Sequence, residues 1–239
     1  MNTEKLSKRL ETVAKYILEG ARFADIGSDH AYLPCYMLKK NKASFAIAGE
    51  VVEGPYKSAC TQVRQEGLSS LISVRKGNGL EVVELGEVDC ITIAGMGGSL
   101  IASILEQGEK KLSTVKRLIL QPNIHAYSIR VWLLENEWKL VQEEIIEEDG
   151  KIYEVLVAEQ GKMVFEDKIN ADAVLLLGPF LMKEKNNIFQ KKWTSEIKNW
   201  QRILTKLKAA PDSEENKQKK EELIAKISLV EEVLLDETN

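Results

Sequence analysis

Two carboxylates and a glycine lie close together in the segment Asp25-Ile26-Gly27-Ser28-Asp29, which ends a short apolar run. A glycine at the end of a strand allows a sharp turn and lets a ligand approach the backbone closely. A pyrophosphate-binding turn would carry G-x-G-x-x-G, but Asp29 stands where the second glycine would be. A phosphate would meet a carboxylate there, whereas a cation would be stabilised. The segment therefore predicts a binding site for a positively charged small molecule.

Polar or glycine-rich residues also follow the later apolar runs. Glu50 could accept hydrogen bonds from both hydroxyls of a ribose, and Asn78 could pair with an adenine edge. Each signal is weak alone, but chance explains their recurrence at five successive strand ends poorly. S-adenosylmethionine combines an adenosine with a sulfonium and an ammonium and has no phosphate, so we predict it as the cofactor. The other segments are Gly77-Asn78-Gly79, Ala94-Gly95-Met96-Gly97-Gly98 and Gln121-Pro122-Asn123.

Strands and helices alternate along the first two-thirds of the chain, which predicts a mostly parallel sheet covered on both faces. In such a sheet, ligands bind beyond the carboxyl ends of the strands. We predict an α/β fold with the Rossmann-like sheet of class I methyltransferases, a helix over 3–19 before it, and a final antiparallel strand. The hairpin signal is Asp149-Gly150. Predicted strands are 21–26, 44–50, 72–75, 88–94, 115–121, 139–147 and 152–159, and predicted helices are 31–40, 54–67, a segment ending at 107, and 127–135.

After Gly161 the pattern becomes helical. Apolar residues step by three and four from Trp193 to Leu207 and again from Leu223 to Leu234, with Ala210-Pro211-Asp212 between the two runs. This predicts an antiparallel helical hairpin or short coiled coil. The expected domains are residues 1–160, with the cofactor site, and residues 161–239, with the hairpin.

The composition is that of an ordinary soluble protein, with 44% hydrophobic and 29% charged residues. We expect a cytoplasmic protein, without a membrane span or signal peptide, and reduced thiols at Cys35, Cys60 and Cys90 in place of a disulfide or metal site. The net charge of −4 hides a basic segment, because residues 183–208 hold eight Lys or Arg and two Glu. We predict contacts with an RNA backbone at Arg9, Lys191, Lys192, Lys198, Arg202 and Lys206.

The run from Ala24 to Pro34 (ADIGSDHAYLP), with Gly54-Pro55, AGMGG at 94–98, Leu120-Gln121-Pro122 and Ser7-Lys8-Arg9-Leu10, resembles the bacterial tRNA (adenine(22)-N(1))-methyltransferase family. The resemblance is strong over about residues 5–160. It implies S-adenosylmethionine as methyl donor and adenine 22, in the D-loop region of tRNA, as target. The cofactor-lining positions would be Asp25, Gly27, Ser28, Asp29, Glu50, Val51, Asn78, Gly79, Ala94, Gly95, Met96 and Gly97. Asn78 is a departure, since many methyltransferases have Asp there.

The segment after the fourth strand bears on the atom that is methylated. Enzymes that methylate exocyclic amines carry (D/N)PP(Y/F/W) there, whereas this chain reads AGMGG. The missing acceptor favours a ring nitrogen, whose lone pair needs alignment more than deprotonation. Candidates for positioning the base are His30, Tyr32 and Asn123. Two alternatives stay open: a methyltransferase for small molecules or other RNA, and a non-catalytic RNA-binding module with a vestigial pocket. For partners, we expect tRNA and no membrane or metal, and we favour a monomer.

Overall fold

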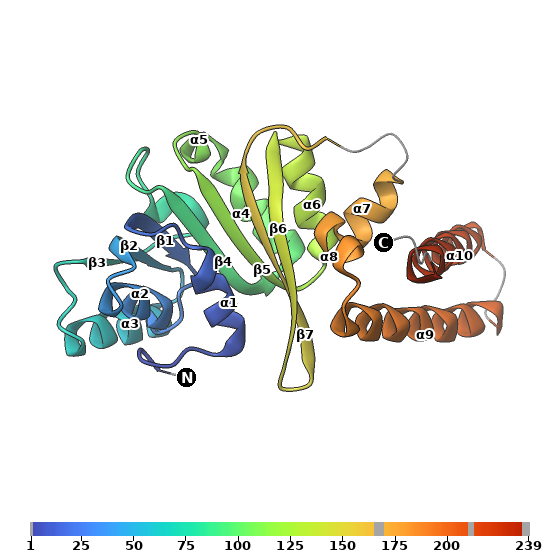
Figure 1. The fold of residues 1–239 in the computed structure, drawn as a ribbon, viewed down its shortest axis with the longest axis horizontal. Coiled ribbons are helices and arrows are strands. Elements are labelled where there is room, and N and C mark those ends of the chain that lie inside the picture. Colours follow the sequence, from blue (N-terminus) through green and yellow to red (C-terminus); the bar gives the residue numbers. More distant parts are fainter. Residues whose placement is uncertain (1, 165–169, 210–212, 236–239) are drawn as a thin grey trace. The chain divides into compact units, whose positions relative to one another are not determined.

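The computed structural model describes residues 2–164, 170–209 and 213–235 (Figure 1). The chain divides into two compact units, residues 1–164 and residues 165–239. Among the described residues, seven strands form one sheet in the order β3-β2-β1-β4-β5-β7-β6. The strands are β1 (Ala21–Ile26), β2 (Ala43–Glu50), β3 (Ile72–Lys76), β4 (Cys90–Gly97), β5 (Arg117–Ile124), β6 (Trp138–Glu148) and β7 (Lys151–Gln160).

The direction of the strands confirms the predicted methyltransferase sheet. Strands β1 to β5 pair in parallel, and β7 pairs antiparallel with both β5 and β6. The hairpin turn at Asp149-Gly150 has positive φ at both residues, as the sequence predicts for this dipeptide. Because β7 lies between β5 and β6, the strand at this edge is β6. Because β1 to β5 run parallel, their carboxyl ends lie along one edge of the sheet.

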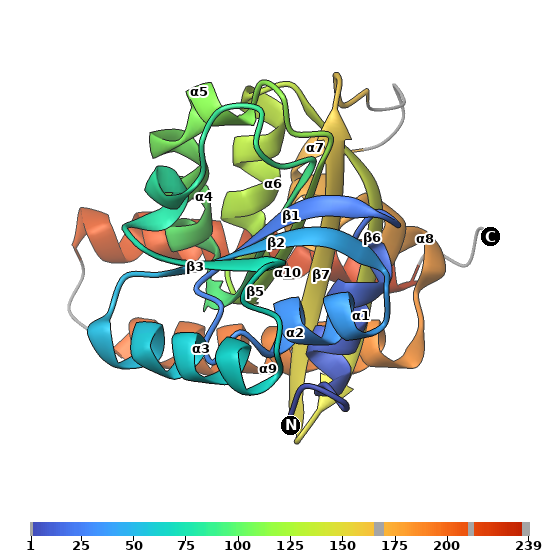
Figure 2. The same cartoon turned by 90° about the vertical axis from the view of Figure 1, so that its left-hand side faces the viewer.

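Helices cover both faces of the sheet in the first unit (Figure 2). α1 (Lys8–Tyr16), α2 (Tyr32–Lys39) and α3 (Glu53–Gln65) lie on one face, and α4 (Gly98–Gln107) and α6 (Ala126–Glu135) lie on the other. The short elements are η1 (Gly79–Val82) and α5 (Glu109–Leu112). The central strands are buried on both faces, so Phe23, Ile91 and Ile119 are inaccessible to solvent. This core fixes the strand ends that carry the predicted site.

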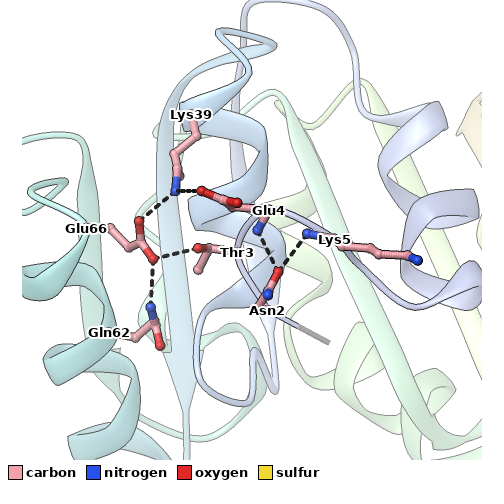
Figure 3. A network of polar contacts seen from close by, with 7 residues as sticks. All are labelled: Asn2, Thr3, Glu4, Lys5, Lys39, Gln62 and Glu66. Atoms are coloured by element: carbon pink, nitrogen blue, oxygen red, sulfur yellow. Dashed lines mark hydrogen bonds and ion pairs between the residues drawn. The ribbon is translucent and has the colours of Figure 1, made fainter.

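Helix α1 is shorter than the sequence predicts. Ser7 caps it, with Ser7 Oγ accepting from Leu10 N–H at 3.3 Å, and residues before Ser7 are not helical because Asn2 Oδ1 accepts from the Glu4 and Lys5 N–H groups. The N-terminal segment is held by Glu66 at the end of α3, which accepts from Thr3, Gln62 and Lys39 (Figure 3). The predicted helix start was wrong because the Asn2 and Ser7 side chains bond to nearby backbone N–H groups.

Strand β6 holds both ends of α1. At the first turn, Glu148 accepts from Lys8 N–H at 2.5 Å and from Arg9 N–H at 3.4 Å. A carboxylate at this end is favoured by the unpaired N–H groups and by the helix dipole. At the last turn, Glu144 accepts from Lys15 and from the Tyr16 hydroxyl. The position of α1 relative to the sheet is therefore set at two points.

The second unit consists of helices in its described part: α7 (Ala171–Leu177), α8 (Pro179–Glu184), α9 (Asn187–Ala209) and α10 (Glu214–Leu235). The sequence pattern suggested one helical run up to Leu207, but Gly178-Pro179 ends α7 and Lys185 adopts a left-handed conformation that ends α8. Helices α9 and α10 pack against each other. They bury Trp193 and Ile197 on α9 and Leu223, Ile227 and Val230 on α10, as the apolar spacing predicts.

None of the described helices is long and apolar enough to cross a membrane. In the described ranges, no group of His, Cys, Asp and Glu is arranged to hold a metal ion. Cys35, Cys60 and Cys90 are free thiols, and burial raises the pKa of both Cys35 and Cys90 to about 12. Cys35 and Cys90 are thus thiols and not thiolates at neutral pH.

Candidate active site at the strand ends

Asp25, at the carboxyl end of β1, is buried and accepts two hydroxyl hydrogen bonds. Its two carboxylate oxygens receive Ser28 Oγ and Thr92 Oγ1, each at 2.6 Å. Burial raises the pKa of Asp25 above its ordinary value of 3.8, and the two hydroxyl donors oppose that rise. Asp25 thereby joins the first turn of the predicted cofactor loop, through Ser28, to Thr92 of the neighbouring strand β4.

The loop after β1 is fastened to the end of β2. The N–H groups of Gly27 and Ser28 donate to the Gly49 carbonyl, and Asp29 N–H donates to Glu50 Oε1. Asp29, His30 and Ala31 all have φ between 36° and 53°, the left-handed region that non-glycine residues seldom occupy in succession. Such a conformation persists only where the surrounding contacts hold it, and it is common at functional sites.

Glu50 joins the two strand ends at the site. The residue is 6% exposed, and burial raises the pKa of its carboxyl, with the Asp29 N–H opposing the rise and the nearby Asp25 adding to it. Gly77 N–H donates to the Glu50 carbonyl at 2.9 Å, which brings the turn after β3 to the same edge. There Asn78 is exposed, Asn78 N–H donates to Glu81 Oε2 at 2.9 Å, and Val51 is 57% exposed.

Gly27 and Met96 bring the turns after β1 and β4 into contact. Gly27 has φ +72°, and a Cβ atom placed on it would lie 2.2 Å from Met96 Cε. The Met96 side chain therefore lies directly over the Gly27 backbone. Met96 is one of the predicted cofactor-lining positions, and the structure brings its side chain to the loop after β1.

Two side chains of β5 hold the turn after β4. The register of β4 and β5 shifts between Ala94 and Met96, so Gly95 has no partner on β5, and Met96 pairs with Pro122, which has no N–H to donate. The side chains replace the missing ladder bonds: Gln121 Oε1 accepts from Gly95 N–H at 3.0 Å, and Asn123 Nδ2 donates to the Gly95 carbonyl at 2.8 Å. Both polar backbone groups of Gly95 are thus bonded, and the AGMGG turn has a defined conformation.

Arg9 reaches this turn from α1. Its Nη1 donates to Gln121 Oε1 at 2.6 Å, and a Cβ atom on Gly95 would lie 3.0 Å from the same Nη1. The guanidinium carbon lies 5.5 Å from the centre of the Tyr153 ring of β7, within range of a cation–π contact. Arg9, which the sequence predicts as an RNA contact, therefore lies against the AGMGG turn at the carboxyl end of β4.

The turns after β4 and β5 also touch through their backbones. A Cβ atom on Gly98 would lie 1.9 Å from the His125 carbonyl oxygen, so only glycine fits there. His125 itself is exposed and left-handed, with φ 61°. The close approach brings the first turn of α4 against the turn that begins α6.

His30 and Tyr32 stack on each other, with ring centres 5.3 Å apart and planes inclined by 22°. His30 is half-buried, lies 3.4 Å from an Asp29 carboxylate oxygen, and lines a shallow polar pocket. The other residues of this pocket are all on α3: Lys57, Ser58, Thr61, Gln62 and Gln65. The three candidates for base positioning thus lie in two places: His30 and Tyr32 stack on each other, whereas Asn123 is bonded to the Gly95 carbonyl.

The basic residues predicted on the hairpin lie on α9. Lys191, Lys198, Arg202 and Lys206 are exposed and fall on one stripe of the helix, opposite the buried Trp193 and Ile197. Lys192 is half-buried and lies over the Trp193 ring, with its Nζ 4.6 Å from the ring centre. The exposed members thus form a continuous basic stripe, which we call the α9 stripe.

Three residues of this arrangement were missing from the predicted site. Gln121 belongs to one of the polar strand-end segments, and the sequence carries a signal for its role, because Gln-Pro at a strand end puts an amide beside a residue that lacks an N–H. Thr92 is a polar residue inside the apolar run Cys90-Ile91-Thr92-Ile93, opposite Asp25 in the strand register. Tyr153 gave no local signal, because it meets Arg9 through the folded hairpin.

Comparison with known proteins identifies the family of the chain. Residues 23–232 match the family described as tRNA (adenine(22)-N(1))-methyltransferase. The chain is 58% identical to the protein of that name from Bacillus subtilis over 235 residues, which cover 98% of this chain and 99% of the relative. A more distant relative, from Mycoplasma genitalium and named a putative tRNA methyltransferase, is 27% identical over 76% of this chain and 81% of its own length.

Solved structures are similar over nearly the whole chain. The crystal structure of Bacillus subtilis TrmK has a TM-score of 0.93 and 57% identity, covering 97% of this chain and 99% of that one. A putative tRNA methyltransferase from Streptococcus pneumoniae in complex with S-adenosyl-L-methionine has a TM-score of 0.80 and 44% identity, covering 96% and 100%. With its sheet, its strand-end turns and these matches, the chain belongs to the tRNA (adenine(22)-N(1))-methyltransferase family.

Proposed function

We propose that this protein transfers a methyl group from S-adenosylmethionine to ring nitrogen one of adenine 22 in tRNA. The observation that carries the proposal is the family match over residues 23–232, together with 58% identity to a protein of that name. The substrate would be cytosolic tRNA, which supports a cytoplasmic location. The strand-end arrangement supports the same chemistry independently.

The residues at the ends of β1 and β2 fit the cofactor. Glu50 is a carboxylate fixed by Asp29 N–H, and only one of its oxygens is used in that bond, so the other can accept ribose hydroxyls. The flexible end of the Met96 side chain covers Gly27 and would move aside for a ligand to approach this backbone, and Asp25 and Asp29 supply negative charge beside a cationic ligand. Asn78 and Gly79 at the end of β3 would face the adenine. When bound, S-adenosylmethionine supplies an electrophilic methyl group on a sulfonium.

The chain's own part in the reaction would be alignment. Neutral adenine already has a lone pair on ring nitrogen one, so the site must hold the base in line and exclude water more than remove a proton. The turn held by Gln121 and Asn123 offers fixed backbone groups at the reacting edge, and the stacked pair His30 and Tyr32 offers an aromatic surface. An adenine in folded RNA must leave its stack to reach such a site.

The α9 stripe would bind the RNA backbone. Its exposed cations lie on the face of α9 opposite the buried Trp193 and Ile197, so they face solvent, where a phosphate backbone could approach them. Structured RNA is recognised largely by shape and backbone contacts, which suits a long helix with one charged face. Sequence specificity would then come from the strand-end site.

The test is to incubate the protein with labelled S-adenosylmethionine and bacterial tRNA. We expect label in one adenine and a stop of reverse transcription at position 22, because methylation of the Watson–Crick nitrogen blocks pairing. Replacing adenine 22 by guanine should abolish uptake, since guanine carries a proton on that nitrogen. An exocyclic N-methyladenine product without a stop would show that another atom is methylated. Label in cytosine or protein would overturn the proposed function.

A further inference from the structure

Arg9 differs from the other arginines that are shielded from solvent. Arg75, Arg117 and Arg130 are half-buried or buried, and each pairs with a carboxylate at 2.6 Å or less. Arg9 is also half-buried, but within the described part of the chain its guanidinium bonds to the neutral Gln121 amide and to no carboxylate. A guanidinium that is partly shielded from water and not paired with an anion keeps an uncompensated positive charge, which favours the binding of an anionic ligand.

The surroundings of Arg9 fix its position. Glu148 accepts from the Arg9 backbone N–H, so the adjacent carboxylate is used for the helix end and not for the side chain. The Tyr153 ring and the Gln121 amide then hold the guanidinium beside Gly95. Only one N–H group of this planar donor set is used by Gln121, so further N–H groups can meet a ligand. A guanidinium held in this way is preorganised to bind a tetrahedral oxyanion with two parallel hydrogen bonds.

We propose that Arg9 binds the phosphate of the nucleotide that is extruded for methylation. This inference rests on the proposed function and adds the residue that holds the target nucleotide by its backbone. The ligand must be an anion with planar or tetrahedral oxygens, and the substrate brings one phosphate with every nucleotide. Because Arg9 is fastened to the turn after β4, a phosphate bound to it places the attached base at the reacting edge. Arg9 thereby acts on binding and on alignment together.

The first experiment compares variants of α1. Arg9→Ala should lower kcat/KM for tRNA by about tenfold to a hundredfold, the effect of losing a hydrogen bond to a charged group, and should flatten the salt dependence by about one phosphate contact. Arg9→Lys keeps the positive charge but loses the planar set of N–H donors, so its kcat/KM should fall between those of the parent and Arg9→Ala. The control is Lys8→Ala, which removes one positive charge from the same helix. Lys8 is an exposed neighbour of Arg9, and its Nζ bonds to the Glu147 carbonyl. Calorimetric affinity for S-adenosylmethionine should stay within about twofold in all three variants.

The second experiment locates the phosphate. Full-length tRNA is assembled from synthetic pieces with a neutral methylphosphonate at single linkages around adenine 22. One linkage should lower kcat/KM for the parent protein and for Lys8→Ala, and have no further effect on Arg9→Ala, since a contact that is already lost cannot be lost again. If every linkage lowers the rate of Arg9→Ala as much as that of the parent, Arg9 only supports the turn and the proposal is wrong. A parent protein that leaves adenine 22 unmethylated would instead overturn the proposed function.

Discussion

Thr92 and Asp25 lie opposite each other in the paired register of β4 and β1, and the Thr92 hydroxyl donates to the Asp25 carboxylate over 2.6 Å. Thr92 is inaccessible to solvent and Asp25 is 4% exposed. The first acid of the cofactor loop is therefore held from inside the sheet. Its conformation is set by a neighbouring strand before any ligand binds.

Thr92→Val should lower both stability and cofactor affinity. The substitution removes a donor to a buried carboxylate and should cost about 1.5–3 kcal/mol in the free energy of unfolding. Denaturant unfolding and calorimetry with S-adenosylmethionine measure the two effects. The control is Thr61→Val on the exposed face of α3, where the hydroxyl bonds only to the Lys57 carbonyl and where we expect little change. Equal effects of the two substitutions would contradict the role given to Thr92.

Glu50 should make cofactor binding depend on pH. Burial raises the pKa of Glu50 above its ordinary value of 4.5, so the carboxylate is lost at a higher pH than in an exposed glutamate. Burial disfavours the charged carboxylate in the folded protein, so protonation of Glu50 costs less there than in an exposed glutamate. Protonation also removes a hydrogen-bond acceptor for the ribose. Affinity should fall as the pH drops through the raised pKa.

Glu50→Gln should bind S-adenosylmethionine with a flatter pH profile, and Glu50→Ala should lose about 1–3 kcal/mol of binding free energy at neutral pH. Glu53→Gln is the matched control, because this exposed residue bonds to Lys57 and Lys76 and its pKa is lowered by them. Titration calorimetry between neutral and mildly acidic pH separates the two. An unchanged profile in Glu50→Gln would mean that another group, such as Asp25, sets the dependence.

Comparing Gly27→Ala with Gly20→Ala should distinguish the cost of backbone strain from a loss of cofactor binding. Gly27 and Gly20 have nearly the same φ, +72° and +71°, but a Cβ atom meets Met96 at Gly27 and nothing within 4 Å at Gly20. Each substitution to Ala should cost about 1–2 kcal/mol of stability through the left-handed backbone, since the flexible end of Met96 can move aside. Only Gly27→Ala should lose cofactor affinity by calorimetry. Parental affinity in Gly27→Ala would show that no ligand approaches this backbone.

Gln121→Ala should slow methylation by releasing the turn after β4. The substitution removes the acceptor shared by Gly95 N–H and Arg9 and should cost about 1–3 kcal/mol of stability. Gln121→Glu keeps the acceptor and adds an ion pair with Arg9, although it loses the donor to the Pro122 carbonyl, so it should be the more stable variant. Gln142→Ala on β6 is the control. Thermal unfolding and single-turnover rates test this order, and the reverse order would contradict it.

Charge reversal on the α9 stripe should weaken tRNA binding. The variant Lys198→Glu, Arg202→Glu, Lys206→Glu changes the net charge by the same amount as Lys217→Glu, Lys219→Glu, Lys226→Glu on α10. Only the first should raise the Kd for tRNA and lower its salt dependence, by up to about three phosphate contacts. Filter binding at several salt concentrations measures both. Equal weakening by the two triple variants would point to net charge and not to the stripe.

The sequence predicted the sheet better than the contacts that complete its edge. β1 occupies the predicted residues because an apolar run ends at a glycine turn, a local signal. β4 extends beyond its predicted end to Gly97, because side-chain amides of β5 continue the pairing past an irregular register. The hydrophobic periodicity of the sequence does not indicate where side-chain hydrogen bonds replace backbone hydrogen bonds between strands. The predicted length of α1 was wrong for a similar reason, since Ser7 and Asn2 bond to backbone groups and stop the helix.

The predicted site residues show the same division. Asp25, Gly27 and Glu50 were found from their types and their places after strands, and the structure brings them together. The surroundings of Arg9 could not be predicted, because Gln121 and Tyr153 come from segments more than 100 residues away. Such contacts depend on the angle at which α1 crosses the sheet, which the sequence pattern leaves open.

The close approach of Gly98 to the His125 carbonyl means that these two segments of the chain constrain each other's evolution. A substitution at Gly98 alone would push a side chain into the backbone at the start of α6. A homologue with any other residue at this position must therefore have a differently built turn after β5, through an insertion, a deletion or a changed residue at 125. The two segments should vary together across homologues, and a chain in which only one has changed would have lost the paired strand ends on which methyl transfer depends.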